Sequence, residues 1–330
     1  MFARIVLPLL LLMLAACGPD IPNIKPPDFQ IPKNTSENGL QVRFSAVTTL
    51  LNKIQKPQQA IFEERSRGTD YNEAMKLRLE TIIKLNRSMA ENAVELYNGC
   101  ASVPRTYTEI VKSCKDFAMK VFNASKTSDE FYQLMLGYTY AGLEKNAAFL
   151  TDRNEQRANE LIKKQHTLSA AVEKPLYVFA KMLQQTKCCD IQPRKRQKSK
   201  LRVIFSTIGE TATTKRLADA IQRASKNTVL VERPTKIIIT VAKLDLQDTG
   251  DQVARVLTMA VIGIPIFGLP GSGGDATASA SVSVQGKNYQ LNLNTFDINV
   301  RDQDALINML ANRIVGAAHF AVLDSMIAEQ

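Results

Sequence analysis

The hydrophobic pattern of this 330-residue chain changes once, near residue 187, and that change limits the folds open to it. From about 40 to 186, apolar residues recur three, four or seven positions apart, as along one face of a helix. The stretch 71–97 shows this spacing at Met75, Leu79, Ile82, Met89, Ala93 and Leu96. From about 201 to 330, short β-branched runs alternate with turns and two helical stretches. We therefore predict the α+β class: an N-terminal all-helical bundle over 40–186, followed by an α/β sandwich domain with an antiparallel hairpin over 201–330.

The helical part divides at turn and capping signals. Asp70 with Glu73, and Thr127 with Glu130, have the spacing of capping boxes and predict two helix starts. Pro57 should break or kink the first helix, and Pro175 the last. The expected helices span residues 41–65, 71–97, 105–123, 129–149 and 152–186.

The C-terminal part has the order strand, helix, strands, hairpin, helix. The expected strands span 201–208, 228–232, 236–244, 277–284 and 289–300, with a helix over 213–224 and a turn at 285–288. The apolar residues of the last strand change parity near Asn294 and Thr295, which predicts a β-bulge there. Asp302 should cap a final helix that buries one face, formed by Leu306, Leu310, Ile314 and Ala317.

A basic run joins the two parts. Residues 187–202 carry a net charge of +6, whereas the whole chain carries +10. We therefore interpret 187–200 as a basic linker, with a contact to anionic lipid headgroups or lipopolysaccharide phosphates as the functional alternative to a solvated linker. The contact candidates are Arg194, Lys195, Arg196, Lys198 and Lys200.

The first sixteen residues predict export from the cytoplasm. They hold one charge, Arg4, followed by an apolar run too short to span a bilayer. The run ends in Leu14-Ala15-Ala16-Cys17, which resembles the lipobox of bacterial lipoproteins. The resemblance implies that residues 1–16 are a signal peptide, that Cys17 is acylated and that 17–39 form a proline-rich tether to the membrane. Gly18 stands where lipoproteins retained in the inner membrane often carry Asp, so the resemblance favours the outer membrane, facing the periplasm, over the inner membrane or the cell surface.

The C-terminal part also resembles a group of periplasmic domains in its layout. The likeness rests on three stretches, 202–205, 216–221 and 229–233, and on the closing hairpin and helix. It is similar to the α/β domain of the curli secretion lipoprotein, to the first domain of the Tol-system propeller protein and to the lipopolysaccharide-assembly lipoprotein. This resemblance implies an envelope role and transfers no functional residue.

Four cysteines remain after Cys17, and an exported chain meets an oxidising compartment. Their number is even, so disulfides are expected among Cys100, Cys114, Cys188 and Cys189. A bond between the adjacent Cys188 and Cys189 would be strained. Our first prediction is that Cys100 and Cys114 each form a disulfide with one of the two adjacent cysteines. The second is a local Cys100–Cys114 bond, with Cys188 and Cys189 free.

An uncharged segment is the other notable feature of the C-terminal part. Residues 256–270 are nearly all apolar, and glycines and prolines interrupt them. They are either core or an exposed loop that contacts a membrane or a partner, and Ile264 and Phe267 are the contact candidates. The glycine-rich stretch after this segment is not a phosphate-binding loop. Gly274 stands where such a loop requires Lys, and Asp275 stands where it requires Ser or Thr.

No catalytic or metal-binding pattern is apparent. His166 and His319 lack the spacing of paired metal ligands, and we expect no metal, no cofactor and no enzymatic activity. Export argues against a nucleic-acid partner. The sequence favours a lipid-anchored binding or assembly subunit of the cell envelope with an envelope protein partner. The alternatives are an oligomeric pore or secretion component that uses 256–270, and a periplasmic hydrolase.

Overall fold

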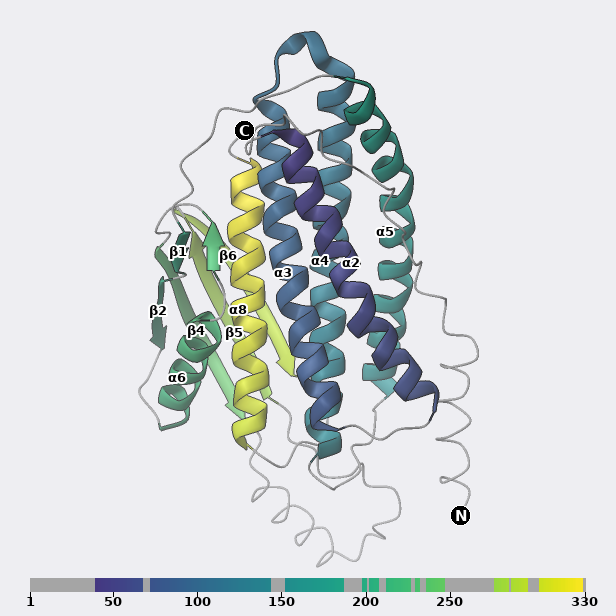
Figure 1. Cartoon of the computed structure of the whole chain (residues 1–330). Helices are drawn as coiled ribbons and strands as arrows, with labels where there is room; N and C mark the ends of the chain where they lie inside the picture. The colour runs from purple at the N-terminus through teal and green to yellow at the C-terminus, as the bar shows by residue number, and fades with distance from the viewer. Residues whose placement is uncertain are drawn as a thin grey trace, which may run out of the picture. The chain divides into compact units, whose positions relative to one another are not determined.

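A computed structural model describes most of the helical part and the main strands of the C-terminal part (Figure 1). The described residues are 39–67, 72–143, 152–186, 198–200, 202–207, 212–226, 229–231, 236–246, 276–284, 286–295 and 303–328. The protein is mostly helical with a small sheet, as the α+β prediction requires. It divides into two compact units. The first comprises Met1–Asp70, Leu77–Asp129 and Glu160–Arg194, and the second Tyr71–Lys76, Glu130–Asn159 and Lys195–Gln330.

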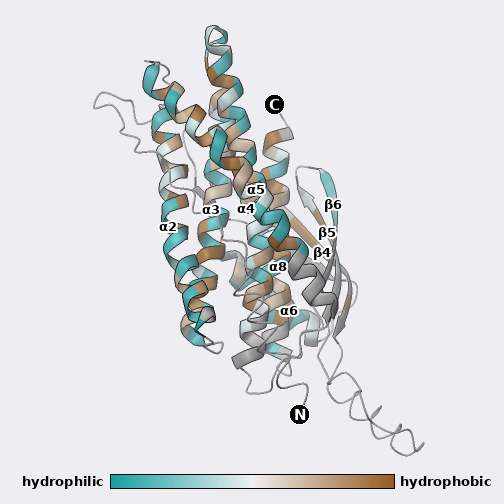
Figure 2. Cartoon of the chain, turned by 90° about the vertical axis from the view of Figure 1, so that its right-hand side faces the viewer, coloured by the Kyte–Doolittle hydropathy of each residue, from teal (hydrophilic) through white to brown (hydrophobic). Residues whose placement is uncertain are grey.

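Four long helices contribute to the first unit and lie alongside one another in Figure 1. They are α2 (Leu40–Ser66), α3 (Glu73–Ala101), α4 (Thr108–Leu143) and α5 (Asp152–Gln185). A 3₁₀ turn, η1 (Arg105–Tyr107), precedes α4. Figure 2 shows hydrophilic and hydrophobic residues mixed along α2 and α5, as expected for helices with one buried and one solvent-facing side.

The prediction of two helices over 105–149 is wrong, because α4 runs unbroken through Thr127. Thr127 and Glu130, interpreted as a capping box, both lie inside α4, and Thr127 is 4% exposed. Their neighbours are also engaged, since Asp129 pairs with Arg87 and Ser125 Oγ donates to the carbonyl of Val121. α4 holds no proline that would end it, so the local capping signal does not start a new helix.

Two other helix details also differ from the prediction. The N-cap of α3 is Asn72, whose Oδ1 accepts the amide hydrogen of Met75 at 2.8 Å, while Asp70 lies outside the described residues. Pro57 and Pro175 do not break α2 and α5, which continue past them. Each proline nevertheless removes one helical hydrogen bond, to the carbonyls of Lys53 and Ala171.

The second unit contains a four-stranded sheet in the order β2-β4-β5-β6. Its strands are β2 (Arg202–Thr207), β4 (Lys236–Leu246), β5 (Ala276–Val284) and β6 (Lys287–Thr295). β2 pairs parallel with β4, and the remaining pairs are antiparallel. The hairpin β5–β6 closes through two residues, and Gly286 takes a φ of 81° that glycine adopts without strain.

A second, two-stranded pairing joins β1 (Lys198–Lys200) antiparallel to β3 (Val229–Val231). Three residues at the end of the expected basic linker are therefore strand. In the part of the last strand that the structure describes, β6 pairs with β5 in continuous register up to Thr295, and residues 296–300, whose parity predicted the β-bulge, lie outside the described residues. A register irregularity lies in β4, between Val241 and Lys243.

One face of the sheet is buried against two helices. Ile239 and Val241 of β4 face Val282 and Ala280 of β5, and all four are at most 2% exposed. α6 (Ala212–Lys226) contacts β2 and α8 (Gln303–Ala328), and α8 contacts β5 and β6. The other face is more exposed and mostly polar, since the half-buried Thr240, Ser281 and Ser283 alternate with the buried residues, and Ile238 on the same face is 36% exposed.

The two C-terminal helices differ in how far the sequence predicted their burial. The sequence predicts one apolar side for α6, with Leu217, Ala220, Ile221 and Ala224, of which the first three are buried and Ala224 is half-buried. In α8, Leu310 and Ile314 are buried and Ala317 is half-buried, but Val315 and His319, outside the predicted face, are buried too. α8 is buried around its circumference because its apolar residues are not confined to one stripe.

Candidate functional site

A disulfide and an aromatic cluster close one end of the four-helix bundle. Cys100, near the end of α3, is bonded to Cys114 in α4, with their Cα atoms 6.0 Å apart. The pairing placed first, between these cysteines and Cys188 or Cys189, is therefore wrong, and the local bond is correct. The physical reason is the short connection after α3, where Ser102 and Val103 donate to the carbonyls of Gly99 and Cys100 and turn the chain back.

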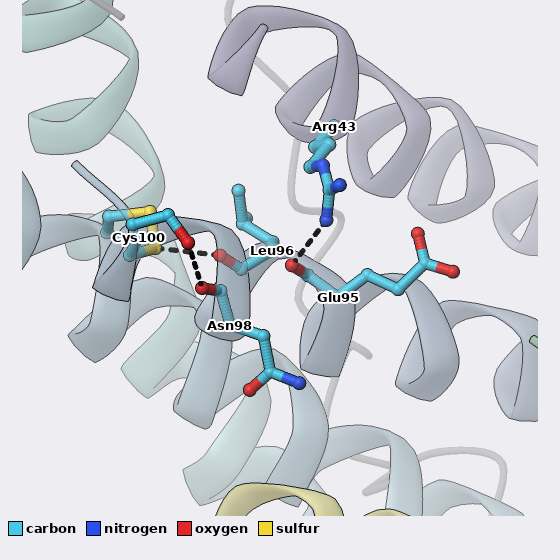
Figure 3. Close-up of a disulfide and its surroundings, with 7 residues drawn as sticks. Arg43, Glu95, Leu96, Asn98 and Cys100 are labelled. Carbon is cyan, nitrogen blue, oxygen red and sulfur yellow. Dashed lines mark hydrogen bonds between the residues drawn. A yellow bond between two sulfur atoms is a disulfide. The ribbon is translucent and has the colours of Figure 1, made fainter. Parts of the chain in front are cut away.

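The neighbouring contacts also hold this end together. The rings of Phe44, Phe117 and Phe179 lie 5.3–5.9 Å apart, centroid to centroid, and come from α2, α4 and α5. Figure 3 shows Arg43 of α2 donating to the carbonyl oxygen of Glu95 in α3, at 2.8 Å. Lys115 Nζ lies 5.1 Å from the centre of the Tyr97 ring. We call Phe44, Cys100, Cys114 and Phe179 the disulfide layer; all four are fully buried.

A second layer of the bundle is polar. Four uncharged polar residues lie fourteen positions from the residues of the disulfide layer. They follow that layer in the sequence of α2 and α4 and precede it in α3 and α5. These are Gln58, Asn86, Ser128 and Gln165, which we call the polar layer. Fourteen residues are two heptads, about 21 Å of helix, so the polar layer lies on the same inward face as the disulfide layer.

A cavity of about 60 Å³ lies at the polar layer, and all four helices line it. All four polar-layer residues face it, together with Gln55 of α2 and Ser169 of α5. The rest of its wall is apolar and comprises Leu51, Ile54, Met89, Val121, Ala124 and Val172. None of the described lining residues is charged. Polar cavities of this kind hold water or a ligand, whereas apolar ones stay dry.

Asn86 is the deepest polar residue of the cavity, at 1% exposed. Its Nδ2 has no hydrogen-bond partner among the described atoms. A buried amide donor of this kind loses its hydration on folding without a protein acceptor in exchange, which is unfavourable. Asn86 therefore brings a donor with no partner among the described atoms to the wall of the cavity.

A buried ion pair flanks the polar layer. Arg87 and Asp129 each follow a polar-layer residue, and Arg87 Nε donates to Asp129 Oδ1 at 3.0 Å, which links α3 to α4. One turn along α3, the pKa of the Glu91 carboxyl is raised to about 8. Burial is the largest cause and the nearby Glu95 carboxylate adds to it, while the Arg87 guanidinium opposes the rise. Glu91 is thus predominantly protonated at neutral pH.

Most residues singled out from the sequence lie outside the described part of the chain. This holds for Cys17, for Cys188 and Cys189, for Arg194, Lys195 and Arg196, and for Ile264 and Phe267. Lys198 and Lys200 are in β1, opposite Val231 and Val229. The two histidines are not brought together in one site, because His166 is exposed on α5 and His319 is buried on α8 beside the Phe320 ring.

Neither a metal site nor a membrane-spanning helix is found where the structure describes the chain. Within the ranges given above, no three His, Cys, Asp or Glu side chains come together as metal ligands. Within the same ranges, no helix has the length and apolar character needed to cross a bilayer. No family model, curated protein or solved structure matches the chain.

Sequence reasoning missed the polar layer, although the sequence contains a signal for it. The apolar spacing of α3 steps by seven from Ile82 to Met89, and Asn86 fills the core position between them. Gln58 follows Leu51 and Ile54 in α2, and Ser128 follows Val121 and Ala124 in α4, at the same spacing. A single polar residue in an otherwise apolar heptad series marks each position.

Proposed function

We propose that this protein is a lipid-anchored, non-enzymatic binding or assembly subunit of the bacterial cell envelope, held at the outer membrane and facing the periplasm. The observation that carries the proposal is Leu14-Ala15-Ala16-Cys17 at the end of an apolar leader. Acylation of Cys17 would anchor the chain, because each buried methylene contributes about 0.8 kcal/mol and several acyl chains together bind a bilayer firmly.

Two further observations support an exported, binding role. The Cys100–Cys114 disulfide agrees with an oxidising compartment, since stable disulfides are rare in the cytosol. A helical bundle followed by a two-layer α/β sandwich with an antiparallel hairpin offers two separate surfaces to an envelope protein partner. The basic run, with Lys198 and Lys200 in β1, is proposed to contact anionic lipid or lipopolysaccharide.

Membrane fractionation of the Cys17→Ser variant tests the anchor. We expect the wild-type chain in the outer-membrane fraction and the variant in the soluble periplasmic fraction. Mass spectrometry of the N-terminal peptide should find acyl chains on Cys17 of the wild type. The matched control is Cys188→Ser/Cys189→Ser, which removes two other cysteines and keeps the anchor.

A second variant separates anchoring from location. Gly18→Asp introduces the residue that lipoproteins retained in the inner membrane often carry, so the protein should move to the inner-membrane fraction and stay acylated. If Cys17→Ser sediments with membranes after a high-salt wash, the anchoring proposal is wrong. If only Gly18→Asp has no effect, the anchor stands and the choice of membrane is wrong.

A further inference from the structure

The polar layer is a built feature of the bundle, because each of the four helices contributes one residue to it. Bundle cores are normally filled with apolar side chains at crystal-like density. Here three carboxamides and one hydroxyl occupy inward positions around a cavity of about 60 Å³. Asn86, 1% exposed, lines this cavity, and no described protein atom accepts a hydrogen bond from its Nδ2.

We propose that this cavity is a binding site for an uncharged polar group, either a small molecule or the end of a larger one, whose oxygen accepts a hydrogen bond from Asn86 Nδ2. This site does not depend on the membrane anchor. Bundle cores are a recurrent location for ligand sites built from side chains of facing helices.

The lining defines the chemistry of the ligand. None of the described lining residues could neutralise a buried charge, and burial of an unpaired charge is strongly unfavourable. The apolar wall, with Met89, Val121 and Val172, suits one or two methyl groups. The carboxamides of Gln58 and Gln165 offer both donors and acceptors. An acetamido group, with a methyl, a carbonyl oxygen and an N–H, matches each of these features.

The cavity is accessible between α2 and α5. Its floor is formed by Asn86 and by residues of α3 and α4, which are buried, whereas Leu51, Gln55, Gln58 and Ser169 on α2 and α5 are half-buried. Pro57 lies between Gln55 and Gln58, and Pro175 lies three residues beyond Val172. Each proline interrupts the helical hydrogen bonding beside the mouth, which makes a local separation of α2 and α5 less unfavourable.

A different role for the same residues must be distinguished from ligand binding. A buried polar residue in a heptad series can set helix register and orientation, with water in the cavity. A register role requires the four side chains but no ligand. A binding role requires that a neutral group of the right size displaces water and that a charged group of the same shape does not.

Acetamide and acetate provide this test because they have the same shape and differ in charge. Binding of each to the full mature chain would be followed by saturation-transfer NMR and by diffraction from soaked crystals. We expect acetamide, and not acetate, to saturate the site, with an oxygen within hydrogen-bond distance of Asn86 Nδ2. The Asn86→Leu variant keeps the shape and removes the donor, so it should weaken acetamide binding about tenfold.

Two further variants keep the test decisive. Asn92→Leu, on the same helix but outside the cavity, should bind acetamide like the wild type. Ala124→Leu fills the cavity and should abolish binding, and it replaces Asn86→Leu if that variant does not fold. The proposal is overturned if acetamide fails to bind the wild type, if acetate binds equally well, or if Ala124→Leu leaves acetamide binding unchanged. Ordered water alone in crystals soaked with acetamide would support the register role instead.

Discussion

The disulfide layer and the polar layer lie two heptads apart on the same four helices, yet their composition is opposite. One layer combines Phe44 and Phe179 with a disulfide, and the other combines three carboxamides with a hydroxyl. Both lie on the inward face of the bundle. The comparison teaches that heptad geometry fixes which positions face inward and leaves open whether they stabilise the bundle or form a site.

The two layers should differ in their contribution to stability. A disulfide that closes a loop of this length contributes roughly 3 kcal/mol in the chain-entropy model, and buried aromatic rings add to it. At the polar layer, an incompletely satisfied amide and a cavity both oppose stability. We therefore expect stability to be concentrated at the disulfide layer and binding at the polar layer.

The largest effect should follow from Phe117→Ala, because the Phe117 ring packs against Phe44 and Phe179 of the disulfide layer. Phe117 is fully buried and its ring lies 5.4 and 5.9 Å from those of Phe44 and Phe179, so its loss leaves a cavity among three helices. We expect the free energy of unfolding to fall by about 3–5 kcal/mol in urea titrations. Ser128→Ala in the polar layer should change it by less than about 1 kcal/mol. Equal losses would mean that the layers do not differ.

A slightly smaller effect is expected from the ion pair beside the polar layer. Arg87→Met deprives the Asp129 carboxylate, 3% exposed, of its guanidinium partner. The free energy of unfolding should fall by about 3 kcal/mol, as measured by chemical denaturation. Arg87→Met/Asp129→Leu removes both charges and should recover most of this loss.

The control for the ion pair is exposed. Lys120→Met breaks the Lys120–Asp116 pair of α4, whose side chains are 38% and 49% exposed, and should alter stability by less than about 1 kcal/mol. If Arg87→Met and Lys120→Met have the same effect, the buried pair does not hold α3 to α4.

A pH-dependent effect should come from Glu91. Its pKa is about 8 in the folded protein against 4.5 for an ordinary Glu, so the folded state binds the extra proton between these values. Because this pKa is raised, Glu91's contribution to stability is fully present below pH 4.5 and is lost as the pH rises toward 8. The slope should reach at most about 1.4 kcal/mol per pH unit.

Glu91→Gln checks this slope, since the amide is uncharged at every pH. Thermal unfolding of the wild type and the variant should converge at low pH, and the variant should become relatively more stable as the pH rises. A difference between the two proteins that is independent of pH would refute the raised pKa.

Apart from the control variants, the smallest expected change in stability comes from Asn86→Leu. Removing an incompletely satisfied amide and filling the inward position should raise the free energy of unfolding by roughly 1 kcal/mol. The reciprocal change, Leu96→Asn near the disulfide layer, buries an amide among apolar side chains and should lower it by several kcal/mol, on the order of 2–4. Calorimetry of both variants gives the sign of the change in unfolding free energy. If Asn86→Leu is less stable than the wild type, the register role is favoured.

Local pattern predicted much of the fold. The apolar spacing in 71–97 and in 213–224 indicated the buried faces of α3 and α6. The β-branched runs in 228–232 and 236–244 indicated β3 and β4, and the alternation in 277–284 indicated β5. Such patterns are predictable because burial of a helix or strand face imposes its own period on neighbouring residues. The capping box at Thr127 and Glu130 failed because α4 continues through both residues and Thr127 is buried, and burial against other elements is not part of any local pattern.

By itself, the sequence determined the switch from helix to mixed α and β structure, the buried faces of α3 and α6 and the number of cysteines available for bonding. The tertiary structure alone decided that Cys100 bonds Cys114, that Asp129 pairs with Arg87 and that four separate polar residues meet around one cavity. The reason is physical. Periodicity depends on neighbours a few residues away in the sequence. Pairings between helices depend on how the turns align one helix with the next, which residues far apart in the sequence decide.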